Sequence, residues 1–253
     1  MSKQETKQET DASYDPFARV YNRHWNSEVP SQIMTVIERL FVPEMALGAR
    51  ILDLCCGTGY TARELSLRGF DVTGLDASNE MLGYARRSAP AASFIQGDAR
   101  FFQMMPIYQG ILSTFDSLNH IMTLEGLMAV FRNVNRALAP GGLFLFDMNM
   151  EKGFLAHWAD YFAIVEDEDV CILRGAYDRG RRTARYDITM FEREGKTWQR
   201  SDALILEKYY PAKEIRRALK AAGFRDISTY DAEKELGLAD HTGRTFFLAR
   251  KDS

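Results

Sequence analysis

Residues 51–59 read Ile-Leu-Asp-Leu-Cys-Cys-Gly-Thr-Gly. The apolar run from Ala49 to Leu54 predicts a buried β-strand, and the glycines after it predict a tight turn. Residues 60–68 then have the pattern of a helix. Such a turn lets the backbone approach a ligand closely, and the helix N-terminus offers unpaired N–H groups to an anion. The stretch therefore predicts a ligand-binding turn at the end of a first strand.

Further strands and helices alternate along the chain after this turn. Ser78 and Thr123 are N-cap residues before apolar residues at helical spacing, and Pro140-Gly141-Gly142 ends the second of these helices. Because strands that alternate with helices form parallel sheets covered on both faces, we predict a doubly wound α/β fold. The expected strands are 71–75, 92–95, 107–114 and 143–147, and the expected helices include 14–25, 31–41 and 79–88.

The pattern changes from residue 161 to residue 210, where strand signals follow one another without a helix. Within residues 184–190, Ala, Tyr, Ile and Met alternate with Arg, Asp and Thr, which is typical of a strand with one buried face. We therefore predict an antiparallel β lobe of three or four strands, inserted after the fifth strand.

The end of the chain returns to the main sheet. A helix between Pro211 and Gly223 is followed by strands at 225–230 and 244–250, the last of them antiparallel. The prediction is thus a Rossmann-like, mostly parallel, seven-stranded sheet. The expected boundaries are a disordered tail over 1–11, a cofactor-binding domain over 12–152 and 211–253, and a substrate lobe over 153–210.

The composition limits the classes of partner. The net charge of -3 is not the basic footprint of proteins that bind nucleic acid, so we expect none. Arg179, Arg181, Arg182 and Arg185 form the densest basic cluster, which we interpret as a solvated hairpin. Three cysteines, two of them adjacent, fit a reducing cytoplasm. No apolar run approaches the roughly 18–20 residues of a membrane helix, and we expect a monomer or homodimer without a metal.

Two kinds of cofactor fit the turn. Gly57-x-Gly59-x-x-Ala62 also matches the dinucleotide fingerprint. Asp76 follows it by about 20 residues, the sequence spacing at which an acid in that fingerprint binds the ribose. Dinucleotide folds do not require an acid such as Asp53 inside the first strand, whereas a ligand with an α-amino group near the turn explains one. Asp98 places a further acid at the same edge of the sheet, where it suits an adenine amino group.

A second dehydrogenase signal comes from Tyr209-Tyr210-Pro211-Ala212-Lys213, which contains Tyr-x-x-x-Lys. That catalytic pair needs a continuous helix, and Pro211 places a strand-to-helix junction there instead. Together with the reversed last strand, this disfavours an NAD(P)-dependent oxidoreductase.

Over residues 14–251 the chain resembles the class I S-adenosylmethionine-dependent methyltransferases. Its LDLCCGTG, GLDAS, QGDAR and LAPGGLFLFD segments resemble the successive motifs of that family. At Cys55 the family more usually has glycine, and we expect a cysteine to be tolerated there provided that the backbone stays extended. The resemblance implies S-adenosylmethionine as cofactor, held by Tyr14, Tyr21, Asp53, Cys56, Gly57, Thr58, Gly59, Asp76, Ala77, Met81, Gly97, Asp98, Ala99, Thr114 and Phe115.

The nearest subgroup is that of small-molecule methyltransferases with an antiparallel lobe after the fifth strand. The segment STFDSLNHIMT resembles sugar-amine N-methyltransferases around His120, which there lines the acceptor pocket. We therefore expect His120 and Asn119 to be catalytic, with His120 accepting a proton or orienting an amine. The expected substrate-binding residues are Asp116, Tyr186, Trp198 and Arg244.

Other functions remain open at this stage. N-methylation of a small molecule is favoured over O-methylation, and RNA or a protein side chain is an alternative acceptor. A cofactor-binding regulator without turnover is a further alternative.

Overall fold

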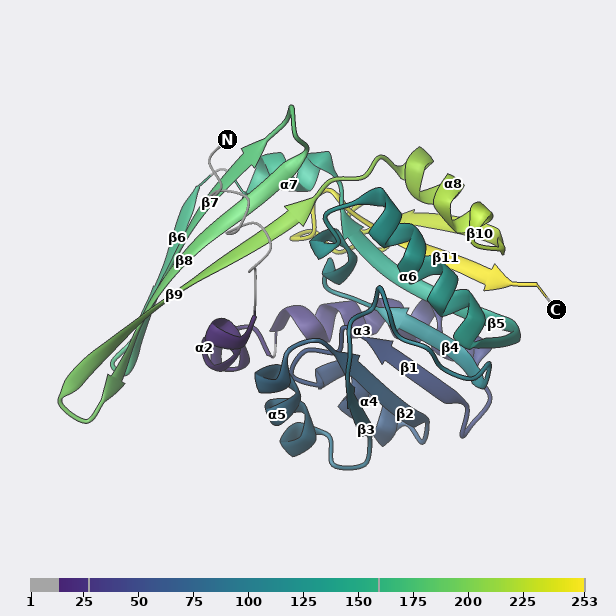
Figure 1. Cartoon of the computed structure of the whole chain (residues 1–253), viewed down its shortest axis with the longest axis horizontal. Coiled ribbons are helices and arrows are strands. Elements are labelled where there is room, and N and C mark those ends of the chain that lie inside the picture. Colours follow the sequence, from purple (N-terminus) through teal and green to yellow (C-terminus); the bar gives the residue numbers. More distant parts are fainter. Residues whose placement is uncertain (1–13, 27, 159, 253) are drawn as a thin grey trace.

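The computed structural model describes residues 14–26, 28–158 and 160–252, and it contains two sheets. The larger sheet has seven strands in the order β10-β11-β5-β4-β1-β2-β3, and the smaller has four in the order β6-β7-β8-β9. Figure 1 shows the smaller sheet projecting away from the larger one, next to the N-terminal helix. The predicted α/β fold with an inserted antiparallel lobe is confirmed; the predicted tail over 1–11 lies outside the described residues.

The elements have the following bounds. The helices are η1 Asp15–Phe17, α2 Ala18–His24, α3 Glu28–Leu40, η2 Val42–Glu44, α4 Tyr60–Leu67, α5 Asn79–Ser88, η3 Ser117–His120, α6 Leu124–Ala137, α7 Glu151–His157 and α8 Ala212–Ala221. The strands are β1 Arg50–Leu54, β2 Asp71–Asp76, β3 Ser93–Gln96, β4 Tyr108–Ser113, β5 Leu138–Asn149, β6 Tyr161–Val165, β7 Asp169–Asp178, β8 Thr183–Glu194, β9 Thr197–Lys208, β10 Phe224–Asp231 and β11 Arg244–Lys251. Within the described ranges, none of the helices has the length and apolarity needed to cross a bilayer.

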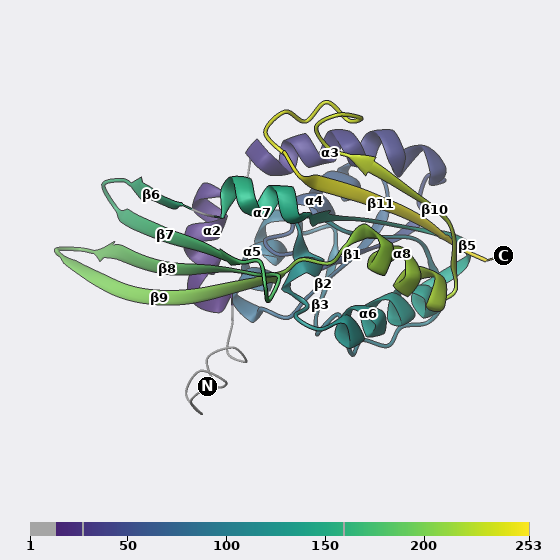
Figure 2. The ribbon, with the colours of Figure 1, turned by 90° about the horizontal axis from the view of Figure 1, so that it is seen from above.

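The larger sheet is buried on both faces, which explains its apolar strands. Successive side chains of β5 alternate between two cores: Phe144 and Phe146 pack with α6 and α8, whereas Leu143 and Leu145 pack with α3 and α4. Figure 2 shows α3 on one side of the sheet and α6 with α8 on the other. This is the doubly wound arrangement that the alternating pattern predicts.

The last strand runs against its neighbours. β11 pairs antiparallel with β5, so that Arg244 lies opposite Asn149, and β10 pairs antiparallel with β11. This reversal brings the first residue of β11 to the edge at which the parallel strands end, which is where ligands bind in open α/β sheets.

Local signals set several helix ends as predicted. Ser78 accepts a hydrogen bond from the Met81 N–H at the start of α5, and Thr123 accepts one from Gly126 at the start of α6. However, α6 ends at Ala137, and β5 starts before the Pro-Gly-Gly segment rather than after it. The strand starts early because Leu138 already pairs with Tyr108 of β4. The next pair is Leu143 with Gly110, and the register shift between the two pairs accommodates the Pro-Gly-Gly turn.

The β lobe has four strands, and the alternation within 184–190 is confirmed. Ala184, Ile188 and Met190 are buried against Phe17 and Phe154. The partner of the lobe is therefore the N-terminal segment together with α7, a helix that the sequence analysis missed.

Cys55 corrects one expectation about the turn after β1. Its backbone is left-handed, with φ +61°, and not extended. Cβ makes this conformation unfavourable by about 1–2 kcal/mol for residues other than glycine. Cys55 is thus a strained residue at a position that suits glycine.

We expect Cys55→Gly to be more stable than Cys55→Ala by about 1 kcal/mol, because only glycine relieves the left-handed strain. Alanine is the matched control, since both variants lose the Sγ contacts. Urea unfolding of the two variants measures the difference, and an alanine variant as stable as the glycine variant would contradict the strain.

Candidate active site

The turn between β1 and α4 leaves space for a ligand at Gly57. This glycine has φ +53°, and a Cβ built on it would meet no atom within 4 Å. Its N–H donates to Asp76 Oδ2 at 2.8 Å, while Oδ1 of the same carboxylate accepts from the Ser78 N–H at 2.9 Å. Burial raises the pKa of Asp76, against backbone hydrogen bonds that lower it. Asp76 is thus held at the end of β2, next to the open side of the turn.

Gly59 also has a role in packing. It is the N-cap of α4 with φ +80°, and a Cβ there would lie 2.9 Å from both Cα and Cβ of Ala85. The glycine therefore allows the turn to pack closely on α5.

Asp53 is buried inside β1, with one carboxylate oxygen accepting the Ala62 N–H in the first turn of α4. Its other oxygen, Oδ2, has no hydrogen-bond partner among the described residues. Burial, aided by Asp76, raises the pKa of Asp53 to about 8. An orphaned buried carboxylate next to an open glycine turn fits a ligand that brings a cationic amino group and a ribose.

The other predicted cofactor residues follow the ends of the same strands. Asp98 lies after β3 and is paired with Arg100, whose Nε is 3.0 Å from both carboxylate oxygens. Arg100 outweighs the effect of burial, so the pKa of Asp98 is lowered. The remaining positions lie after β1 for Cys56 and Thr58, after β2 for Ala77 and Met81, after β3 for Gly97 and Ala99, and after β4 for Thr114 and Phe115.

The N-terminal segment, residues 14–26, is fastened across these loops. Asp15 accepts a hydrogen bond from the Ser78 hydroxyl, and Asn26 accepts one from Thr58 Oγ1 at 2.9 Å. Tyr14 directly precedes the first anchor and Tyr21 lies between the two, and their rings meet edge to face with centroids 6.2 Å apart. The structure thus places both tyrosines beside the loops that follow β1 and β2.

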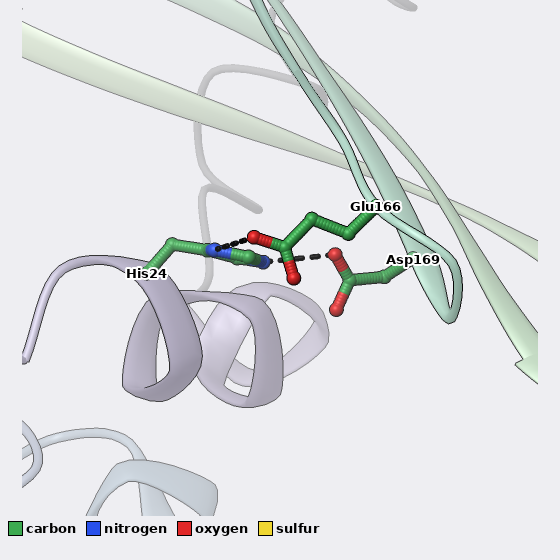
Figure 3. A group of neighbouring side chains, drawn as sticks. All are labelled: His24, Glu166 and Asp169. Carbon is green, nitrogen blue, oxygen red and sulfur yellow. Dashed lines mark hydrogen bonds and ion pairs between the residues drawn. The ribbon is translucent and has the colours of Figure 1, made fainter.

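The same segment is bound to the β lobe by charged side chains (Figure 3). His24 Nε2 lies 2.8 Å from Asp169 Oδ1, and His24 Nδ1 lies 3.9 Å from Glu166 Oε1. The three residues have the composition of a metal site. Arg23 already supplies a positive charge at 2.7 Å from Asp169 Oδ2, so we interpret the group as an ion-paired contact between α2 and the lobe.

His120 is the last residue of η3 and has both ring nitrogens engaged. Nδ1 lies 2.8 Å from the Leu206 carbonyl oxygen, and Nε2 lies 3.0 Å from the Tyr14 hydroxyl. Burial lowers the pKa of His120, partly offset by Asp116. The ring is therefore neutral at pH 7 and is positioned between the N-terminal segment and the lobe.

Arg244 was expected at the rim of the site. The structure instead places it at the centre of a buried ion cluster. Its Nη2 lies 2.9 Å from Asp116 Oδ1, and its Nη1 donates to Asp147. Asp147 also accepts the N–H groups of Phe115 (2.8 Å) and Asp116 (3.0 Å). Because both ends of the guanidinium bind protein carboxylates, we interpret Arg244 as the residue that orders this loop.

Glu207 is a site residue that the sequence analysis missed. It is buried on β9, with Oε1 3.8 Å from His120 Nε2 and Oε2 3.3 Å from the Asn149 amide. Burial and the neighbouring Asp116 raise the pKa of Glu207 well above its usual range. Its signal in the sequence is an acid that directly follows the apolar run 203–206 in β9.

Asn119 has a different place from the catalytic one expected. It is fully buried, its Oδ1 accepts the Asn149 N–H, and its Nδ2 donates to the carbonyls of Asn149 and Lys208. These bonds join η3 to β5 and β9, so we interpret Asn119 as a residue that positions His120.

Trp198 and Tyr186, the two aromatic residues predicted for the acceptor pocket, lie in different parts of the β lobe. Trp198 is 47% exposed near the tip of the β8–β9 hairpin, and it lies nine residues before Glu207, or about 30 Å along the strand. Tyr186 lies nearer the site: burial, Glu207 and Asp116 raise its pKa to about 12. Its hydroxyl donates to the His157 carbonyl at 2.7 Å, and its ring stacks on that of Trp158 with the centroids 3.9 Å apart.

Known proteins are similar to this chain in sequence. The family described as "Methyltransferase domain" matches residues 51–142. "Putative methyltransferase YqeM" of Bacillus subtilis is 30% identical over 243 residues, which span 94% of this chain and 97% of that protein. This chain belongs to the S-adenosylmethionine-dependent methyltransferases.

Two further relatives bear on this methyltransferase. The crystal structure of an S-adenosylmethionine-dependent methyltransferase from Clostridium acetobutylicum superposes with a TM-score of 0.78 at 23% identity, over 95% of this chain and 99% of that one. The dTDP-3-amino-3,4,6-trideoxy-alpha-D-glucopyranose N,N-dimethyltransferase of Streptomyces venezuelae is 34% identical over 93 residues, or 37% of this chain and 39% of that protein.

For this methyltransferase, Asp76→Ala should weaken binding of S-adenosylhomocysteine at least tenfold. Hydrogen bonds to a charged group contribute about 1.5–3 kcal/mol, and about 1.4 kcal/mol is a factor of ten. Isothermal titration calorimetry measures the affinity. Asp71→Ala, at the exposed opposite end of β2, is the control, and equal affinity in a folded Asp76→Ala variant would remove Asp76 from the cofactor site.

Proposed function

We propose that this enzyme methylates the nitrogen of a small-molecule amine. The observation that carries the proposal is the acidic surrounding of Tyr14 and His120. Burial raises the pKa of Tyr14 well above its usual range, and the nearby Glu207, Asp116 and Asp76 raise it further. Negative charge at this point stabilises the positive charge that an amine nitrogen gains as it is methylated, and it opposes the alkoxide that an alcohol would have to form.

The charge distribution of the β lobe supports a small acceptor over RNA. The arginines of the β7–β8 hairpin are paired with acids: Arg179 with Glu151 and Arg182 with Glu214. The predicted solvated hairpin thus has balanced charges and does not present the basic surface that a phosphate backbone requires. The name of the Streptomyces venezuelae relative adds an amino-sugar nucleotide as a candidate class of acceptor.

The residues of the chain have a limited set of tasks in this reaction. When bound, the cofactor supplies an activated methyl group on a sulfonium sulfur. The protein has to hold the acceptor nitrogen in line with that methyl at about 3–3.5 Å, keep water out and provide a place for the proton that the amine loses. Gly57 and Asp76 would hold the cofactor, and the loop that carries Asp116 and His120 would hold the acceptor.

A methyl-transfer screen tests the proposal. The full chain is incubated with S-adenosylmethionine and pools of amines (amino-sugar nucleotides included), alcohols, carboxylic acids and RNA, and products are detected by mass. We expect a mass gain of one methylene unit in the amine pool, lost in Asp76→Ala. Methylation confined to alcohols, acids or RNA would overturn the N-methylation proposal while leaving the cofactor assignment intact.

A further inference from the structure

The contact between Tyr14 and His120 fixes the position of two protons. A backbone carbonyl can only accept, so the Leu206 oxygen at 2.8 Å requires the hydrogen of the neutral imidazole to be on Nδ1. Nε2 is then a lone pair, and it accepts the Tyr14 O–H at 3.0 Å. Because the Tyr14 hydrogen points to His120, the tyrosine oxygen is left with lone pairs that can accept another hydrogen bond.

We propose that Tyr14 contacts the acceptor amine and passes its proton to His120, so that the two side chains act together as the base of the reaction. This inference rests on the proposed function, since it assigns to that site the residue that touches the acceptor. It gives Tyr14 a catalytic role in addition to its predicted place beside the cofactor.

The step balances as follows. The acceptor nitrogen uses its lone pair to form the C–N bond with the methyl carbon, while the S–C bond breaks and its electron pair stays on sulfur. An N–H bond of the acceptor breaks as a new O–H bond forms on Tyr14. The original Tyr14 O–H bond breaks as an N–H bond forms on His120 Nε2. The products are the methylated amine, S-adenosylhomocysteine and a protonated His120.

The charges around the pair suit this transfer. Burial raises the pKa of the Tyr14 phenol well above its usual range, so a free phenolate is disfavoured and the two proton transfers are concerted. The titratable groups that face His120 are Tyr14 from the N-terminal segment, Asp116 from the loop after β4 and Glu207 from β9. Asp116 stabilises the imidazolium once it forms, because it raises the pKa that burial lowers.

The base is also assembled from separate parts of the chain. Tyr14 precedes η1, whose Asp15 is bonded to Ser78 at the cofactor edge. His120 belongs to the loop after β4, and the Leu206 carbonyl belongs to the β lobe. The relay is therefore complete only when the N-terminal segment and the lobe are both docked on the sheet.

Nitrogen-15 NMR tests the proton positions without turnover. In the full chain saturated with S-adenosylhomocysteine, wild-type His120 should be the Nδ1–H tautomer, with Nε2 shifted as a hydrogen-bonded acceptor. Tyr14→Phe should remove that shift at Nε2, whereas Tyr21→Phe should keep it. A hydrogen on Nε2 in the wild-type protein near pH 7 would overturn the relay.

Kinetics test the transfer itself, with the amine that reacts fastest in the screen as acceptor. Tyr14→Phe should lower kcat about 100-fold, within the range typical of lost acid–base catalysis, with the KM for S-adenosylmethionine within threefold of wild type. Wild-type kcat should fall on the acid side of the His120 titration, because protonated Nε2 cannot accept. Tyr161→Phe, at an exposed tyrosine of β6 outside the site, is the control and should retain most of kcat.

The outcomes separate the two proposals. A kcat for Tyr14→Phe within threefold of wild type overturns the relay but leaves N-methylation standing. If no amine is methylated, the proposed function fails, and the same kinetics are run with whichever acceptor in the screen reacts. A Tyr14→Phe variant that loses S-adenosylhomocysteine affinity as well as kcat would assign Tyr14 to the cofactor and overturn its role as base.

Discussion

The site depends on the contact of one arginine with two acids. Arg244 joins Asp116, in the loop after β4, to Asp147 on β5, and all three side chains are largely removed from water. Two carboxylates so close together require a positive charge between them, and removing one partner from a buried ion pair typically costs about 3–5 kcal/mol. The reversed direction of β11 makes the contact possible, since it brings the first residue of that strand to the edge where β4 and β5 end.

This cluster shapes the loop that carries His120. Phe115 and Asp116 both have left-handed backbones, with φ +65° and +49°, and both donate their N–H groups to Asp147. Asn119 then fastens η3 to β5 and β9, which places His120 against the lobe. Glu207, from the β lobe, and Tyr14, from the N-terminal segment, both lie next to Nε2 of His120. Three separate parts of the chain thus meet at one imidazole.

Much of this fold is predictable because its signals are local. The turn after β1, the caps at Ser78 and Thr123, and the period-two pattern over 184–190 each reflect nearby residues, and the structure confirms the elements they predict. The cofactor edge follows from the same logic, because parallel strands end together. Asp147 could have been found by this rule, since it lies near the end of β5.

The rest depends on contacts between residues far apart in the sequence. The left-handed backbone of Cys55 and the packing of Gly59 on Ala85 are set by tertiary geometry, which motif resemblance alone does not specify. Trp198 was misplaced because the length of β9 carries it to the hairpin tip. The sequence marks Arg244 and Asn119 as polar residues near the site, but only the structure shows that protein groups already occupy both side chains.

Hydrogen exchange of the Phe115 and Asp116 amides tests most directly whether Arg244 orders the loop after β4. Lysine at position 244 keeps the charge but cannot bridge two carboxylates with a planar fork. Amide exchange measured by NMR in the wild-type protein and in Arg244→Lys should show protection at both amides that is lost in the variant, while amides in the β1–β4 ladder keep theirs. Unchanged protection of Phe115 and Asp116 in Arg244→Lys would contradict the account.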